Sequence, residues 1–442
     1  MKSLIILFLF ANTLCFSQQE NFKQLNTLFD VLEVNNKAMG SVAIMKEGKL
    51  VYSKSIGFQY KTNKEKKPTS HVSKYRIGSI TKVITASMIF QLIDEKKIHL
   101  EDKLALYFPE IPNAKKITIT NLLTHSSGLF NITEDTNFST WMLKPSTQEQ
   151  MLARIKSHEV IFEPGDQNEY SNTNFILLGY ILEKIEEKPY KMVLKERIAD
   201  KLHLTNTYYG SVIKTNKNEC QSYYYDKNEL TPAVETHMSN PGGAGGVVSS
   251  ATDLTTFMNA LFTEKIMSST SFEQMTKPSD SGTCSGIFSL ERNGQTIFGH
   301  GGSIDGFTSF AMYIPEIKTA IAITLNASEY GTQPIAFHMH DVINGKNITI
   351  PNFDKIELTA AQLKAYEGVY ESASLPFDLT FKASGNILKG GPDSKHLRTL
   401  VANKKDEFAL EAMGIILKFD VQNNTVLFND QTSEPTLLTK KQ

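Results

Sequence analysis

The short apolar run between Ser41 and Lys46 predicts a strand, and Glu47-Gly48 form a turn after it. A second strand-like segment, over residues 50–57, returns along the first and completes a hairpin. From about Ser79 to Asp94, apolar residues lie around most of the helical wheel. This pattern predicts a helix that is buried on several sides.

The middle of the chain has a helical period, and the later part returns to strands. We expect helices beginning near Thr118, Asn172 and Ser250, where residues that cap helices precede apolar runs. The later strands and a last helix are expected at residues 286–292, 295–300, 309–316, 319–326 and 335–342. Consecutive strands joined by short turns pair antiparallel, so the predicted class is α+β: an antiparallel sheet flanked by helices, with a helical subdomain. The N-terminal hairpin must join the late strands to complete this sheet.

The pattern changes again after about Pro351. Six to eight short strands lie between Gly368 and Thr439, separated by Gly, Asn and Asp turns. They predict a small all-β, barrel-like domain. A chain of 442 residues is too long for one ordinary core. We therefore expect a main domain over residues 18–350 and a C-terminal β domain over residues 360–442.

The first residues predict export. Lys2 precedes an apolar run over residues 4–10, and the small residues Cys15 and Ser17 follow. This arrangement is typical of a secretory signal peptide, here over residues 1–17, so we expect a periplasmic or secreted protein. A lipoprotein is the weaker alternative, because bulky Leu14 stands where such signals need a small residue. No other apolar stretch is long enough to cross a bilayer, so no stable membrane insertion is expected.

The composition limits the classes of partner that we expect. The net charge is -1, and without a basic excess no nucleic-acid partner is expected. A small-molecule or peptide substrate fits better, and the oligomeric state stays open. No zinc-protease, phosphate-loop or dinucleotide motif occurs, so neither a metal nor a cofactor is expected. Cys220 and Cys284 remain after removal of the signal peptide, and their spacing leaves open whether they form a disulfide.

Ser79 and Lys82 are the first candidates for chemistry. Three residues apart on a helix, their side chains lie on one face. A serine hydroxyl needs a base to take its proton, and a lysine in a poorly solvated site can serve as that base. The helix start adds a positive dipole end that favours a developing alkoxide. Alone, the pattern also fits a helix-capping serine beside a surface lysine.

Tyr170 and Asn172 form the second candidate pair. They are two apart in an extended segment before a predicted helix, so both side chains point the same way. A phenol near an ammonium can relay protons, and the amide can hold a substrate carbonyl or the lysine. The alternative is that Tyr170 belongs to the core and Asn172 caps the next helix.

His300, Gly301 and Gly302 are the third candidate group, at the end of a predicted strand. Glycines allow a ligand to approach the strand edge closely, and the histidine offers a donor or partial positive charge to a substrate. The alternative is a β-turn with an incidental histidine. His125 is predicted to make a structural hydrogen bond, and His338 and His340 point apart on their helix, which disfavours a metal site.

The motifs S-x-x-K, Y-x-N and His-Gly-Gly, in this order, resemble the penicillin-recognising serine hydrolases. That family includes class C β-lactamases, D-alanyl-D-alanine carboxypeptidases, D-aminopeptidases and related esterases. Residues 117–129, 163–185 and 299–315 are similar to family segments, and the resemblance covers roughly residues 36–344. It implies that Ser79 is a nucleophile that forms an acyl-enzyme and that Lys82 is its base.

The resemblance also implies the other roles. Tyr170 shares proton transfer and protonates the leaving group, while Asn172 and the His300-Gly301-Gly302 triplet help to hold the substrate. The oxyanion hole is expected from the Ser79 N–H and an N–H on the strand after His300. The C-terminal domain resembles the lipocalin-like appendages of some D-amino-acid peptidases of this family.

The triplet departs from the Lys-Thr-Gly of many relatives. A permanent cation is replaced by a group expected to titrate near neutrality, so recognition of a substrate carboxylate is weakened. We expect a peptidase, carboxypeptidase or esterase acting on D-amino-acid peptides or on small amides and esters. A β-lactamase and a slowly turning over penicillin-binding sensor are the alternatives.

Overall fold

The structure is a computed structural model that describes residues 22–226, 229–279, 282–430 and 435–441. The predicted signal peptide, residues 1–17, lies outside these ranges. The chain divides by its contacts into two compact units, Ala38–Ser328 and the residues before Ala38 together with Glu329–Gln442. We call them the main unit and the second unit. This division does not follow the predicted domain boundaries, 18–350 and 360–442, which stay a prediction.

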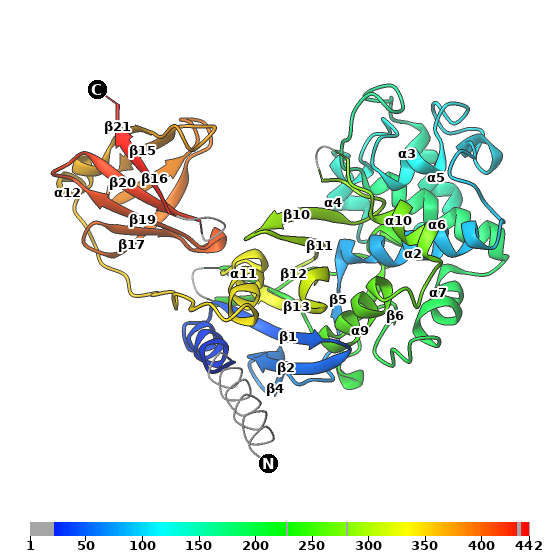
Figure 1. The fold of residues 1–442 in the computed structure, drawn as a ribbon, viewed down its shortest axis with the longest axis horizontal. Coiled ribbons are helices and arrows are strands. Elements are labelled where there is room, and N and C mark those ends of the chain that lie inside the picture. Colours follow the sequence, from blue (N-terminus) through cyan, green and yellow to red (C-terminus); the bar gives the residue numbers. More distant parts are fainter. Residues whose placement is uncertain (1–21, 227–228, 280–281, 431–434, 442) are drawn as a thin grey trace, which may run out of the picture. The chain divides into compact units, whose positions relative to one another are not determined.

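A six-stranded antiparallel sheet is the frame of the main unit (Figure 1). Its strands, in spatial order, are β10 (Phe288–Arg292), β11 (Gln295–Ile304), β12 (Phe307–Ile314), β13 (Thr319–Ser328), β1 (Ala38–Lys46) and β2 (Lys49–Ile56). The N-terminal hairpin joins the late strands through the β1–β13 pair, as predicted. β1 and β13 are buried along almost their whole length, which is expected for central strands with both faces covered.

Helix α2 (Thr81–Asp94) is the centre of the helical part, and 12 of its 14 residues are buried. It packs against α6 (Asn172–Glu186), α8 (Gly242–Gly245) and α10 (Ser269–Thr276), while α9 (Ala251–Phe262) packs on β1, β12 and β13. The remaining helices of this unit are α3 (Ile119–Leu123), α4 (Phe138–Trp141), α5 (Gln148–Lys156) and α7 (Tyr190–Leu194). Three small sheets pair β3 (Phe58–Lys61) with β4 (Lys66–Pro68), β5 (Tyr75–Arg76) and β6 (Tyr208–Tyr209) with β9 (Val247–Ser249), and β7 (Tyr223–Asp226) with β8 (Glu229–Pro232).

The second unit holds a helix over residues 22–34, helix α11 (Thr332–Ile343), the short helix α12 (Ala360–Leu363) and a closed antiparallel barrel of eight strands. The barrel strands are β14 (Gly368–Glu371), β15 (Leu379–Ser384), β16 (Ile387–Gly391), β17 (Arg398–Lys404), β18 (Glu407–Leu410), β19 (Ile415–Asp420), β20 (Thr425–Asn429) and β21 (Thr436–Lys440). The predicted α+β class and the barrel-like C-terminal part are confirmed.

Both cysteines left open by the sequence are buried and free. Cys220 packs with Tyr75 and Phe307, and Cys284 belongs to the large core of the main unit. Within the described ranges, no helix is long and apolar enough to span a bilayer, and no cluster of three or more His, Cys, Asp or Glu side chains could hold a metal ion.

Candidate active site

Ser79 lies in a 3-10 turn, η1 (Gly78–Ile80), that leads directly into α2. The helix therefore begins two residues later than the sequence predicts, and the N-cap position is Ile80 rather than Ser79. The turn lies against β11: a Cβ added at Gly78, whose φ is +51°, would lie 2.7 Å from the Ser303 nitrogen. Only glycine tolerates both this φ and this approach without strain.

Strand β11 has an open edge beside this turn. Its pairing with β10 ends at Gly299, which is opposite Phe288, whereas its pairing with β12 continues to Ile304. Gly302 lies so close to the turn that an added Cβ would be 2.0 Å from the Ile77 carbonyl oxygen. The two glycines thus bring the Ser79 turn and the edge of β11 together.

The Ser79 hydroxyl contacts both predicted proton-transfer groups. Lys82 Nζ lies 3.0 Å from Ser79 Oγ, and the Tyr170 hydroxyl donates to the same oxygen at 2.7 Å. The structure therefore brings Tyr170, which is 91 positions from Ser79 in the sequence, to the same oxygen atom as Lys82.

Lys82 is completely buried, and its partners carry no charge. Besides Ser79, Nζ donates to Asn172 Oδ1 at 2.8 Å and to the Ala244 carbonyl oxygen at 2.9 Å. Burial lowers the pKa of Lys82 well below its ordinary value of 10.5, because no carboxylate among its hydrogen-bond partners compensates for the lost hydration. The amine is thus closer to losing its proton than an exposed lysine.

Asn172 holds the lysine. While Oδ1 accepts from Lys82, Nδ2 donates to Thr133 Oγ1 at 3.1 Å and approaches Asn131 Oδ1 at 3.3 Å. Both ends of the amide are therefore engaged, and Ser171, not Asn172, is the N-cap of α6. Asn131, Thr133 and Ala244 were not singled out by the sequence, since a loop residue and a backbone carbonyl carry no motif.

Tyr170 is held as a neutral phenol. Burial raises its pKa to about 12, and its ring lies 4.5 Å, centroid to centroid, from the ring of His125. His125 Nδ1 in turn accepts from the Ser171 N–H at 3.2 Å, which is the structural hydrogen bond expected for this histidine.

His300 differs from the expectation. Its side chain is buried, and its Nδ1 donates to the Gly301 carbonyl oxygen. Burial, followed by the nearby Lys82 charge, lowers the pKa of His300 to about 3, so the imidazole is uncharged at neutral pH instead of titrating there. None of His300, Gly301 and Gly302 lines the cavity beside Ser79.

A cavity of about 420 Å³ opens beside Ser79. Its apolar lining includes Ile132, Phe138, Trp141, Met142 and Ile176. Its polar lining includes Ser303, Thr236 and Asp305. None of the described residues that line it is a lysine or arginine, and the buried Asp305 carboxylate is paired with Arg76 at 2.6 Å. The cavity therefore offers no unpaired cation.

Comparisons with known proteins show which family this chain belongs to. The model of a family described as Beta-lactamase matches residues 33–336. PbpX of Bacillus subtilis (strain 168) is 27% identical over 244 residues, and the alignment covers 55% of this chain but only 60% of that protein.

Two solved structures share the fold. An octameric penicillin-binding protein homologue from Pyrococcus abyssi has a TM-score of 0.68 and 25% identity, over 94% of this chain and 99% of that chain. A D-amino acid amidase from Ochrobactrum anthropi SV3 has a TM-score of 0.59 and 26% identity, over 72% of this chain and 96% of that chain.

Proposed function

This chain belongs to the beta-lactamase family, and from that membership we propose that it is a serine hydrolase in which Ser79 forms an acyl-enzyme. One observation carries the proposal: the Ser79 hydroxyl lies 3.0 Å from the amine of a completely buried lysine. A buried lysine without a carboxylate partner is costly to keep charged, and such a group suits a general base better than a structural role.

The hydrogen bonds of Lys82 suggest which way the lone pair of its neutral amine points. A neutral amine has two hydrogens and one lone pair. Asn172 Oδ1 and the Ala244 carbonyl oxygen accept the two hydrogens, so the lone pair is left for the Ser79 hydroxyl. Lys82 then takes the hydroxyl proton as Ser79 Oγ bonds to the substrate carbonyl carbon.

The carbonyl oxygen becomes an oxyanion in this step. The N–H groups of Ser79 and Ser303 are its proposed donors, because η1 lies against the open edge of β11 at this point. The Tyr170 phenol gives its proton to the leaving group as the carbonyl–heteroatom bond breaks, and Lys82 returns a proton to Tyr170. Water then attacks the acyl-enzyme by the reverse proton path and releases the acid.

We propose a substrate that is an uncharged amide or ester with an apolar acyl group. The apolar lining of the cavity suits such a group, and the amidase neighbour named above adds D-amino-acid amides to the favoured class. β-Lactams and D-alanyl-D-alanine peptides carry a carboxylate near the scissile bond, which finds no unpaired cation here. The β-lactamase alternative is therefore weaker, and so is the carboxypeptidase activity among the expected ones. The other alternative, a slowly turning over acylated sensor, differs from the proposed hydrolase only in its rate of turnover.

We also propose export. The support is the pattern of a basic residue, an apolar run and small residues over 1–17, which places the protein in the periplasm or outside the cell.

The first test is covalent labelling. A fluorophosphonate probe should add its mass to the wild type and to Ser157→Ala, an exposed serine at the end of α5, but not to Ser79→Ala. An unlabelled wild type, with the probe active on a control hydrolase, would overturn the proposed function. Turnover of D-aminoacyl amides, p-nitrophenyl esters, D-alanyl-D-alanine peptides and nitrocefin then separates the alternatives: a stable acyl-enzyme without turnover indicates the sensor.

A further inference from the structure

The barrel of the second unit is closed at one end. Helix α12 and the 3-10 turn η7 (Lys364–Tyr366) place Leu363 and Tyr366 in its interior. The Tyr366 ring packs edge-to-face on Phe408 and Phe419, at centroid distances of 4.8 and 5.1 Å. Aromatic packing of this kind fills the interior at this end and leaves no room for a ligand.

The other end is hollow. A cavity of about 570 Å³ is lined by side chains near the ends of β15 to β20, with Pro334 and Phe337 of α11, in the same unit, on one side. Five buried apolar side chains of the barrel interior line it: Leu379, Phe381, Leu400, Leu417 and Phe428. Gly390 also lines it, and the ring of Phe381 lies against the space that a side chain there would take. An eight-stranded barrel is just wide enough to be filled by side chains or to hold one small ligand.

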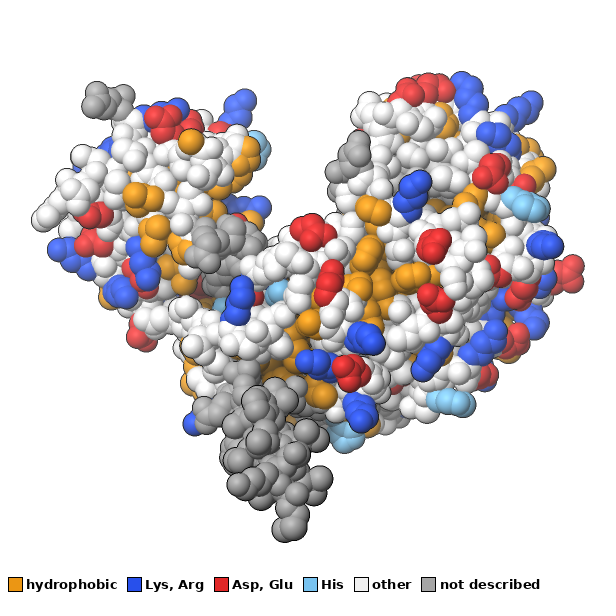
Figure 2. All heavy atoms as spheres, viewed as in Figure 1, with side chains coloured by type: hydrophobic (Ala, Val, Ile, Leu, Met, Phe, Trp, Pro, Cys, Tyr) orange, Lys and Arg blue, Asp and Glu red, His pale blue; other side chains and the backbone are white. Residues whose placement is uncertain are grey.

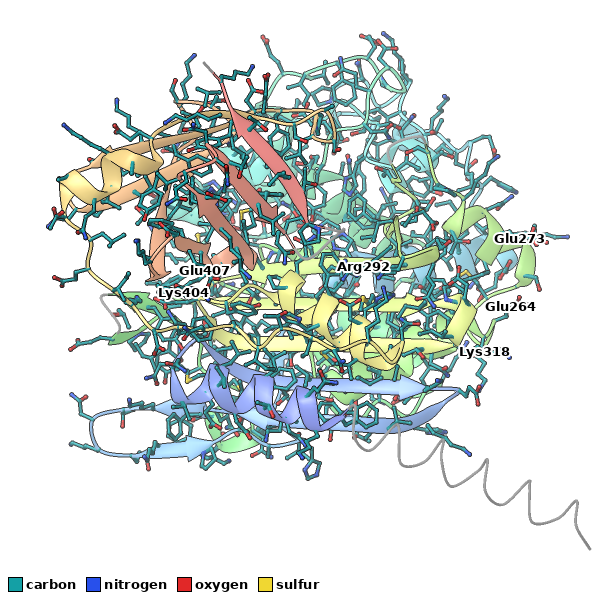
Figure 3. The ribbon with its side chains drawn as sticks, turned by 60° about the vertical axis from the view of Figure 1, so that its left-hand side comes forward. Glu264, Glu273, Arg292, Lys318, Lys404 and Glu407 are labelled. Atoms are coloured by element: carbon teal, nitrogen blue, oxygen red, sulfur yellow. The ribbon has the colours of Figure 1, made fainter. Side chains whose placement is uncertain are left out.

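One cation stands at the mouth without a partner. Arg398 is two residues before Leu400 on β17, so its side chain lies on the same inward face, and it lines the cavity. Its guanidinium makes no hydrogen bond or ion pair with any residue that the structure describes, and the carboxylate of Asp430 lines the same cavity. Two other basic groups of the barrel are engaged: His396 with Asp393 at 2.7 Å, and Lys404 with Glu407 at 3.2 Å (Figure 3).

We propose that this cavity is a second binding site, which takes a single-chain aliphatic carboxylate. The chain would lie among the apolar side chains, and the carboxylate would pair with the guanidinium of Arg398 at the mouth. The volume is in the range of small-molecule sites, and a planar guanidinium matches a carboxylate with two parallel hydrogen bonds. This site does not depend on the proposed function of Ser79.

Titration calorimetry with decanoate below its micellar concentration tests the site. The protein is Ser79→Ala, so that no turnover occurs, and the variants are made in that background. We expect one decanoate per chain. Arg398→Gln should weaken binding about fivefold or more, because one solvent-exposed charge-assisted contact is lost. Lys382 is an exposed lysine of β15 that points outward, so Lys382→Gln should not change the affinity.

Leu400→Trp fills the cavity and should abolish binding in a variant that keeps its far-UV circular dichroism. Decyltrimethylammonium, with the same chain and the opposite charge, should bind far more weakly than decanoate. No decanoate binding to the folded Ser79→Ala protein overturns the proposal. If Arg398→Gln and Leu400→Trp both bind decanoate as tightly as the parent protein, the proposal is also overturned. The decanoate would then lie elsewhere, for example beside Ser79.

Discussion

Lys82 is unusual among buried charged groups in having only neutral partners. A buried ion normally keeps its charge through a counter-ion, and its removal leaves that partner uncompensated. Here, Asn172, Ala244 and Ser79 offer oxygen atoms without a formal charge. The neutral amine therefore fits the site better than the ammonium, and this favours proton acceptance from Ser79.

This environment predicts how labelling depends on pH. The pKa of Lys82 is lowered by burial, so the amine is protonated and inactive below that pKa and free above it. The rate of fluorophosphonate labelling should fall about tenfold per pH unit on the acid side and level off at higher pH, well before 10.5. Lys82→Met should abolish labelling at every pH, and Lys97→Met, an exposed lysine, should keep the wild-type profile. A profile that is flat across the acid side would contradict lysine as the base.

The contact between η1 and β11 is the structural element on which the site depends. η1 has only three residues, and beyond Gly299 the strand β11 is paired on one side alone, with β12. Because Gly302 has no side chain, η1 and β11 can approach each other closely at this point. The proposed oxyanion donors, the N–H groups of Ser79 and Ser303, depend on this approach.

Substitutions at two adjacent glycines test whether this close approach of η1 and β11 matters. At Gly302 an added Cβ would lie 2.0 Å from the Ile77 carbonyl oxygen, whereas at Gly301 its closest contact would be the Phe310 ring at 3.7 Å. Gly302→Ala should lower the labelling rate by about a hundredfold or more, the effect of losing one oxyanion donor. Gly301→Ala should stay within about threefold of the wild type. Similar rates for the two variants would mean that the approach of β11 does not set the reactivity of Ser79.

The sequence predicts the long elements and not the short ones. The helices from Asn172 and Ser250 have a helical period, and the hairpin over 41–57 and the late strands stand out as short apolar runs bounded by turn residues. Helix α8 (Gly242–Gly245) and the strands of two or three residues have no period to detect. They are set by packing against distant elements, as where α8 meets Gly179 of α6.

The same limit applies to the site. Ser79, Lys82 and Tyr170 stand in recognisable motifs, and the structure places them at one atom. Ala244 and Ser303 act through backbone groups that any residue has, so no side-chain pattern marks them. The neutral state of His300 could not be predicted either, because it follows from burial, which depends on the assembled fold.

In the second unit, Lys37 ties the segment before the main unit to the barrel. It is buried and pairs with Glu329 at 2.9 Å and with Glu411, which precedes β19, at 2.5 Å. These three residues are far apart in the sequence, so the ion pairs close long loops of chain. Removing one partner of a buried pair leaves the other charge without compensation.

Lys37→Met should therefore destabilise the protein by about 2–4 kcal/mol in urea unfolding, because the Glu411 carboxylate loses its cation. Lys404→Met removes an exposed lysine beside Glu407 (Figure 3) and should cost less than about 1 kcal/mol. Adding Glu411→Gln to Lys37→Met should recover part of the loss. Equal unfolding midpoints for the two single variants would show that Lys37 contributes no more than a surface pair.

The absence of a counter-ion at Lys82 has a consequence for the whole molecule. Charges of both signs are mixed over the face in Figure 2, and the net charge is -1, so the protein has no strong electrostatic field to steer a substrate. The proposed substrate is itself uncharged. The reacting groups described here are likewise neutral before the reaction starts. Dissolved ions screen charge–charge interactions, and such an enzyme has few of these to lose. An exported hydrolase with this site would keep its rate as the salinity of its surroundings rises and falls.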